Sequence, residues 1–142
     1  RYDTFANVAR CMPPLSSSRC RIEPYKSMTE AQEEADPARV CHLNLAGQSV
    51  DVLPEEIGEF TRLQSLDLSS TGLKTLSEEI GLLKELRTLL LKKNNLTSLP
   101  NTISRLGQLQ LLDLSRNNAL PSTEQQRIRQ LLPWLSPDRL RF

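Results

Sequence analysis

Apolar residues recur along this chain at a regular interval of 23 residues. The interval links Leu43, Leu66, Leu89 and Leu112, and it also links Leu45, Leu68, Leu91 and Leu114. Further apolar positions repeat in the same phase, and together they define the unit LxxLxLxxNxLxxLPxxIxxLxx. Internal repeats with a period of about 20–50 residues are the signature of repeat architectures. The chain is therefore predicted to stack similar units rather than to fold around one irregular core.

Each unit contains two local patterns. The LxL core alternates apolar and polar residues with period 2, which predicts a short strand with its leucines inside. A later segment begins at Pro54 in the first unit and carries Ile57 and Phe60 at the i, i+3 spacing of a helix. One unit cannot bury its own apolar face, so neighbouring units stack and share a continuous core. The predicted fold is an α/β solenoid with short parallel strands on the concave face and short helices on the convex face.

The turn after each strand has a preferred residue in this unit. Asn suits it because its side chain can satisfy backbone groups of the neighbouring turn. Asn94 and Asn117 fit this pattern, whereas Gln48 and Thr71 depart from it, so the first two turns are expected to be less regular. Ser77 stands where the unit otherwise carries Pro.

Both ends of such a solenoid need a cap that shields the last core layer from water. Residues 40–118 are predicted to form about four repeats. Residues 25–39 precede them as a helical N-terminal cap, with Ser27 as the helix N-cap residue of a helix over 27–34. Residues 1–24, with their prolines and serines, are predicted to be an irregular extension.

The C-terminal cap is predicted over residues 119–142. Its helix spans 125–132, with Ser122 or Thr123 as the N-cap residue, and Pro133 ends it. Residues 139–142 are candidates for a short closing strand. The apolar side of this helix then covers the last repeat.

The repeat unit is similar to the 23-residue class of leucine-rich repeats found in many bacterial proteins. The flanking runs 25–31, 36–40, 117–121 and 124–133 resemble the caps of secreted or surface-exposed leucine-rich-repeat proteins of the Leptospira type. The resemblance covers roughly residues 25–142. It implies a protein-binding module without catalytic activity or cofactor, secreted or on the bacterial cell surface, with a host protein among the candidate partners. Because the chain starts at Arg1 without a leader, any signal peptide is expected to have been removed.

Composition agrees with a binding scaffold. Leucine supplies 27 of 142 residues and aromatic residues only 4%, as in a repeating leucine core. A formal net charge of +1 argues against a nucleic-acid partner, which normally requires a strongly basic surface. No apolar stretch of about 18 residues is present, so no membrane span is predicted.

The best candidate site is the outward side of the four predicted strands. Its apolar centre, Leu90 and Leu111, lies between Asp67 and Asp113, with Lys92, Lys93 and Arg116 along one rim, as in many protein interfaces. The opposing interpretation is that single exposed leucines are common and carry no function. The predicted contact residues are His42, Asn44, Ser65, Asp67, Thr88, Leu90, Lys92, Leu111, Asp113 and Ser115.

Other chemistry is weakly supported. His42 is the only histidine, and pairing it with Cys41 or Asp67 leaves too few ligands for a structural zinc site. Cys41 and His42 are neighbours on a strand, so their side chains point to opposite faces. A Cys/His nucleophile lacks an orienting third group, so neither a metal site nor catalysis is predicted.

The three cysteines leave several pairings open. In an exported protein the favoured bridge joins Cys11 to Cys20, while Cys20–Cys41 and Cys11–Cys41 remain the alternatives. Any pairing leaves one thiol, which could join two chains. An intracellular protein would keep all three reduced.

The convex side is predicted to be acidic. A solvated helical face explains this most simply, and docking of a basic partner is the minority interpretation. The glutamates concerned are Glu55, Glu56, Glu59, Glu78, Glu79 and Glu85. The competing hypotheses for the whole chain are a secreted interaction module, the recognition domain of a larger effector enzyme, and a self-assembling structural protein.

Overall fold

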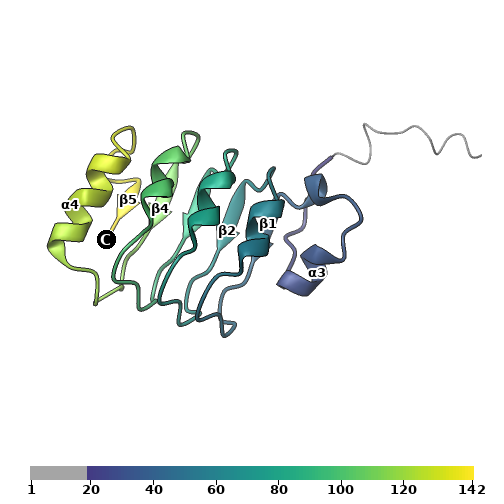
Figure 1. Ribbon diagram of the computed structural model, residues 1–142, viewed down its shortest axis with the longest axis horizontal. Coiled ribbons are helices and arrows are strands. Elements are labelled where there is room, and N and C mark those ends of the chain that lie inside the picture. Colours follow the sequence, from purple (N-terminus) through teal and green to yellow (C-terminus); the bar gives the residue numbers. More distant parts are fainter. Residues whose placement is uncertain (1–18) are drawn as a thin grey trace, which may run out of the picture.

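The computed structural model describes residues 19–142 as one elongated array (Figure 1). Its sheet is parallel and its strands follow one another in chain order, β1-β2-β3-β4-β5. The strands are β1 (His42–Asn44), β2 (Ser65–Asp67), β3 (Thr88–Leu90), β4 (Leu111–Asp113) and β5 (Leu140–Arg141). Within residues 19–142 the α-helices are α3 (Met28–Gln32) and α4 (Ser122–Leu131), and they lie at opposite ends of the array. None of the helices within residues 19–142 is both long and apolar enough to cross a bilayer.

The repeat registers place each strand against the next at the predicted interval. Leu43, Leu66, Leu89 and Leu112 are aligned neighbours, and all four are buried. Their strand neighbours on either side are half-buried or exposed, except Asp113, which is buried. The predicted parallel solenoid is therefore confirmed, because the period-2 alternation puts one leucine row into the shared core.

The side opposite the strands carries short helices of the 3-10 type. They are η2 (Glu55–Glu59), η3 (Glu78–Leu82) and η4 (Asn101–Arg105), and a shorter one, η1 (Pro37–Arg39), precedes β1. Their bonds span three residues, as from Ile57 N to Pro54 O at 3.1 Å. Short helical segments often adopt the 3-10 form, and the tighter turn still buries Ile57.

The two asparagine positions satisfy backbone groups of the neighbouring turn, as the sequence predicts, and Thr71 departs from that pattern, as also predicted. Asn94 is 5% exposed, its Oδ1 accepts from Thr71 N and Leu73 N, and its Nδ2 donates to Leu68 O and Leu91 O. Thr71 is itself buried, and its hydroxyl donates to Leu68 O at 2.9 Å. The Thr71 hydroxyl therefore satisfies a carbonyl of its own turn, and Asn94 of the next repeat accepts from the N–H groups of Thr71 and Leu73.

Asn117 repeats this arrangement one unit later. Its Oδ1 accepts from Leu96 N at 3.1 Å, and its Nδ2 donates to Leu91 O and Leu114 O. Gln48 instead lies exposed at the start of the array and donates to Lys26 O, so the first turn does depart from the pattern.

Ser77 marks a site at which stability can be gained. Its φ of −70° and ψ of 155° match those of Pro54 (φ −64°) and Pro100 (φ −67°), and its buried hydroxyl has no hydrogen-bond partner within the described residues. We expect Ser77→Pro to raise the free energy of unfolding by about 0.5–1 kcal/mol, because proline restricts the unfolded chain. Urea unfolding followed by circular dichroism measures this. Ser77→Ala removes only the hydroxyl, so it shows how much of the stability change comes from losing that group. A destabilised Ser77→Pro variant would contradict the prediction.

The N-terminal cap joins the sheet through Tyr25. Ser27 is the N-cap residue of α3, as predicted, and accepts from Glu30 N at 3.0 Å. Tyr25 pairs with Leu43 as a parallel bridge, with hydrogen bonds of 2.9 and 2.8 Å to the backbone of β1. The Tyr25 ring is buried, and its hydroxyl donates to Glu34 at 2.6 Å. Burial and this hydrogen bond raise the pKa of Tyr25.

This bridge also decides the disulfide. Because Tyr25 is bound to β1, the segment before it runs beside the start of that strand, where Arg21 N donates to Arg39 O at 3.2 Å. Cys20 and Cys41 then lie 5.4 Å apart at their Cα atoms and form a disulfide. The favoured Cys11–Cys20 pairing is therefore wrong, and the alternative Cys20–Cys41 pairing is the one formed. Cys11 itself, with most of the predicted extension over 1–24, lies outside the described residues.

The C-terminal cap consists of α4 and β5. The helix begins at Ser122, earlier than predicted, and its N-cap residue is Pro121, so neither Ser122 nor Thr123 caps it with a side chain. The Glu124 carboxylate instead accepts from Leu99 N of the neighbouring repeat at 3.1 Å, and it pairs with Arg127 of the same helix at 2.7 Å. The Arg127 guanidinium holds the pKa of this carboxyl below its usual range. β5 pairs with β4, which confirms the predicted closing strand.

Candidate functional site

The predicted contact residues form an aligned surface on the outer side of β1–β4, which we call the strand face. One row follows the first strand positions, and a second row follows the last. The first row is His42, Ser65, Thr88 and Leu111, and the second is Asn44, Asp67, Leu90 and Asp113. Lys92 and Ser115 lie two residues beyond the ends of β3 and β4. The sheet register therefore brings together side chains that lie 23 residues apart in the sequence.

Several polar side chains of this face are engaged within the chain. His42 Nδ1 lies 2.8 Å from the hydroxyl oxygen of Ser65 on the next strand. Asp67 Oδ1 accepts from Ser69 N at 2.9 Å. Asp113 is 9% exposed and accepts from both the backbone N–H and the hydroxyl of Ser115. Asp113 therefore supports the turn after β4 and offers little surface to a partner, unlike the sequence-based picture of an exposed carboxylate.

A shallow depression of about 200 Å³ lies on the strand face over β1, β2 and β3. Leu90 and Thr88 of β3, both half-buried, line it together with Asp67 of β2 and Asn44 of β1. Pro24 from the N-terminal cap completes it, a residue that sequence analysis did not connect with the site. Leu111 lies outside this depression, so the two predicted apolar contacts are separate features.

The structure adds Arg141 to the strand face. Because Asp113 pairs with Arg141 in the β4–β5 ladder, the second row continues into the C-terminal cap. Arg141 is exposed. The alternating Leu140 and Phe142 could have revealed this extension, because the residue between two inward-facing apolar side chains points outward. With Lys92 and Arg116, Arg141 makes the C-terminal part of this face basic.

No group of three or more potential metal ligands comes together within residues 19–142. Cys41 is buried in its disulfide, so it offers neither a thiolate nucleophile nor a metal ligand beside His42. Cys41 and His42 do face opposite sides, as predicted, with His42 half-buried on the strand face.

The predicted acidic side consists of glutamates on η2, on η3 and in the turns beside them. Glu55, Glu56, Glu59 and Glu78 are exposed, and Glu79 and Glu85 are half-buried. Glu85 lies 4.0 Å from Arg62 of the preceding repeat. The acidic groups are thus spread along the array, opposite the strand face.

An array of parallel strands and 3-10 helices closed by two caps, with a continuous polar and apolar strand face, defines a leucine-rich-repeat solenoid. The chain belongs to the leucine-rich-repeat family: the model of the leucine-rich repeat region matches residues 38–131. Proteins of this family and fold are typically non-enzymatic protein-binding modules.

A solved structure of a leucine-rich-repeat protein of Leptospira interrogans is 35% identical to this chain, with a TM-score of 0.72. The match covers 84% of this chain and 29% of that protein, so the chain spans less than a third of its length. No curated protein sequence matches this chain. The expected resemblance to the Leptospira proteins is confirmed.

Proposed function

We propose that this protein is an interaction module that binds a protein partner non-covalently through its strand face. The observation that carries this proposal is the depression beside Leu90, in which a half-buried apolar side chain is surrounded by polar groups from three aligned strands. An apolar centre with a polar rim is the usual construction of a protein interface. Arg141, Lys92 and Arg116 extend that rim toward the C-terminal cap.

We further propose that the protein is secreted or displayed on a bacterial surface. The Cys20–Cys41 disulfide supports this location, because such bonds persist mainly in oxidising compartments. An exposed location makes a host extracellular or cell-surface protein a candidate partner. A second candidate function is recognition of a partner on behalf of a larger protein, which the much greater length of the Leptospira relative supports.

The proposed face is tested by replacing Leu90 with lysine. Leu90 lies between Asp67 and Asp113 in the register, so lysine suits its neighbours while it disrupts an apolar contact. We expect Leu90→Lys to weaken partner binding about tenfold or more, as at a central interface residue. The free energy of unfolding is expected to fall by no more than about 1 kcal/mol, since the side chain is only half-buried.

The measurement is a pull-down from host extracellular and cell-surface proteins, followed by calorimetric titration of the captured protein. Leu82→Lys is the matched control, because Leu82 is 48% exposed on η3, away from the strand face. A partner lost with Leu90→Lys and kept with Leu82→Lys supports the strand face. Equal binding by both variants would move the site elsewhere.

A further inference from the structure

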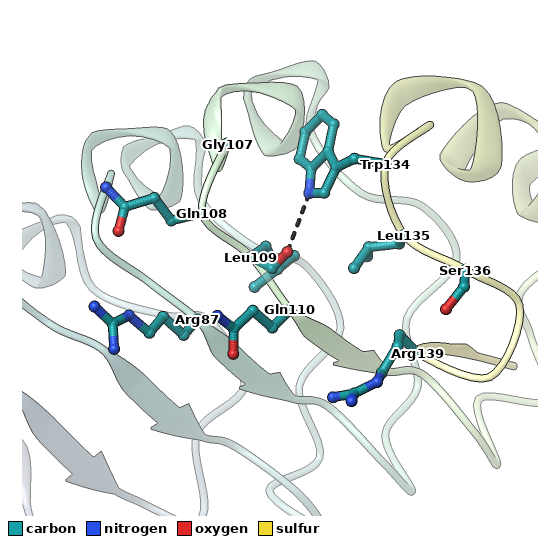
Figure 2. A pocket seen from close by; sticks show the side chains of 9 residues that line it. All are labelled: Arg87, Gly107, Gln108, Leu109, Gln110, Trp134, Leu135, Ser136 and Arg139. Atoms are coloured by element: carbon teal, nitrogen blue, oxygen red, sulfur yellow. Dashed lines mark hydrogen bonds between the residues drawn. The ribbon is translucent and has the colours of Figure 1, made fainter.

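A second candidate surface lies outside the depression beside Leu90. It is a groove of about 800 Å³ between the fourth repeat and the C-terminal cap, which we call the cap groove. Leu109, Leu135 and Trp134 supply its apolar part (Figure 2). Trp134 is 43% exposed, and its indole N–H donates to Leu109 O at 3.0 Å. This bond fixes the ring, so the groove presents a large, rigid apolar surface to solvent.

The cap groove is positively charged. Arg87 and Arg139 line it, both are exposed, and none of its lining residues is acidic. Figure 2 shows these two side chains on the strand side of the groove, with Trp134 across from them. Neither guanidinium forms an ion pair within the described residues, and the nearby Asp138 instead accepts from the Ser136 hydroxyl at 2.6 Å. The groove therefore favours an anionic occupant.

The backbone at this place ends a series of hydrogen bonds. In three successive repeats one carbonyl accepts two N–H groups of the next repeat, namely Cys41 O from Gln64 and Ser65, Gln64 O from Arg87 and Thr88, and Arg87 O from Gln110 and Leu111. Gln110 O is next in this series, accepts no such pair within residues 19–142, and belongs to a residue that lines the groove. An extended peptide can supply N–H groups to such a backbone edge.

We propose that the cap groove binds an extended acidic peptide segment in which an apolar side chain is flanked by Asp or Glu. The apolar side chain packs against Trp134 and Leu135, and the flanking carboxylates pair with Arg87 and Arg139. The peptide backbone donates to Gln110 O. Charge alone would suit a sulfated glycan equally well, but the apolar wall and the backbone acceptor favour a peptide.

The test uses Trp134 as its own reporter, because it is the only tryptophan in the chain. The acetylated, amidated hexapeptide Asp-Glu-Leu-Leu-Glu-Asp is titrated into the full chain at low salt, and tryptophan fluorescence is followed. We expect a saturable change that weakens with added salt. The double variant Arg87→Gln, Arg139→Gln is expected to raise Kd about tenfold, as two partly exposed ion pairs are lost.

Two controls make the result specific. Arg105→Gln removes an exposed arginine that does not line the groove, and Leu90→Lys alters the strand face; both are expected to bind the peptide as the unaltered chain does. The proposal is overturned if a peptide with lysine in place of each acidic residue binds equally well, or if the double variant binds unchanged. It is also overturned if a heparin hexasaccharide binds through the two arginines while the acidic peptide gives no saturable change.

Discussion

Replacing Asn94 by alanine is expected to lower the free energy of unfolding by about 3–5 kcal/mol, because several buried backbone groups lose their partners together. Asn94 Oδ1 accepts from the N–H groups of Thr71 and Leu73, and its Nδ2 donates to the carbonyls of Leu68 and Leu91. All of these groups lie in the buried turn between two repeats. Alanine offers them neither donor nor acceptor, so these buried groups lose the hydrogen bonds that offset their removal from water.

Urea unfolding followed by circular dichroism measures this loss, and Asn95→Ala is the matched control. Asn95 is the same residue type one position further on, but its side chain is exposed. We expect Asn95→Ala to change the free energy of unfolding by less than about 0.5 kcal/mol, as for ordinary surface substitutions. Equal stability of the two variants would show that the asparagine bonds contribute little to repeat packing.

Asn94→Asp shows how much of this stability comes from the donor bonds of Asn94, because aspartate keeps the acceptor oxygen and loses the N–H donors. Aspartate retains an acceptor for Thr71 N and Leu73 N, but it places a carboxylate against the carbonyls of Leu68 and Leu91. At neutral pH we expect a loss at least as large as that of Asn94→Ala, because a buried charge facing acceptors is strongly unfavourable. Protonation removes that charge, so this variant is expected to regain stability as the pH falls, whereas Asn94→Ala is not.

Removing the Cys20–Cys41 disulfide is expected to cost about 3 kcal/mol of unfolding free energy in the chain-entropy model. The bond closes a loop with a sequence separation of 21 residues, and that loop contains α3 and Tyr25. Cys20→Ser is the appropriate variant, because Cys20 is half-buried and Cys41 is fully buried. Unfolding in urea without reductant gives the difference from the unaltered chain.

Cys11→Ser distinguishes this pairing from the one favoured by the sequence. With Cys20 bonded to Cys41, Cys11→Ser is expected to leave stability unchanged. Adding reductant should then lower the stability of the unaltered chain and of Cys11→Ser alike, but leave Cys20→Ser almost unaffected. A loss of stability in Cys11→Ser that matches the loss in Cys20→Ser would contradict the assigned pairing, and mass spectrometry of peptides digested without reduction provides an independent check.

Most of the repeat array could be predicted from the sequence. The 23-residue interval fixes which leucines face the core, and therefore which residues of β1–β4 face outward. Tight local rules also placed Ser27 at the start of α3 and Asn94 in its turn. These features follow from the sequence because burial in a stacked repeat depends mainly on a residue's position within its unit.

The candidate sites depended more on tertiary structure. Sequence spacing brought Leu90 and Asp67 to one face, but it could not show that Asp113 is buried by its bonds to Ser115. Pro24 and Arg141 join the strand face only because the caps pair with the first and last repeats. The cap groove depends on where the chain returns after α4, which no periodic pattern specifies.

The sequence by itself determined the solenoid, its register and its outward strand residues, because a repeated pattern of apolar side chains has one way to share a continuous core. Only the tertiary structure decided the Cys20–Cys41 pairing and the groove beside Trp134. Each of these depends on distances between segments that are not repeats of one another. Such distances are set where a cap meets the array, and there the interval of 23 residues no longer applies.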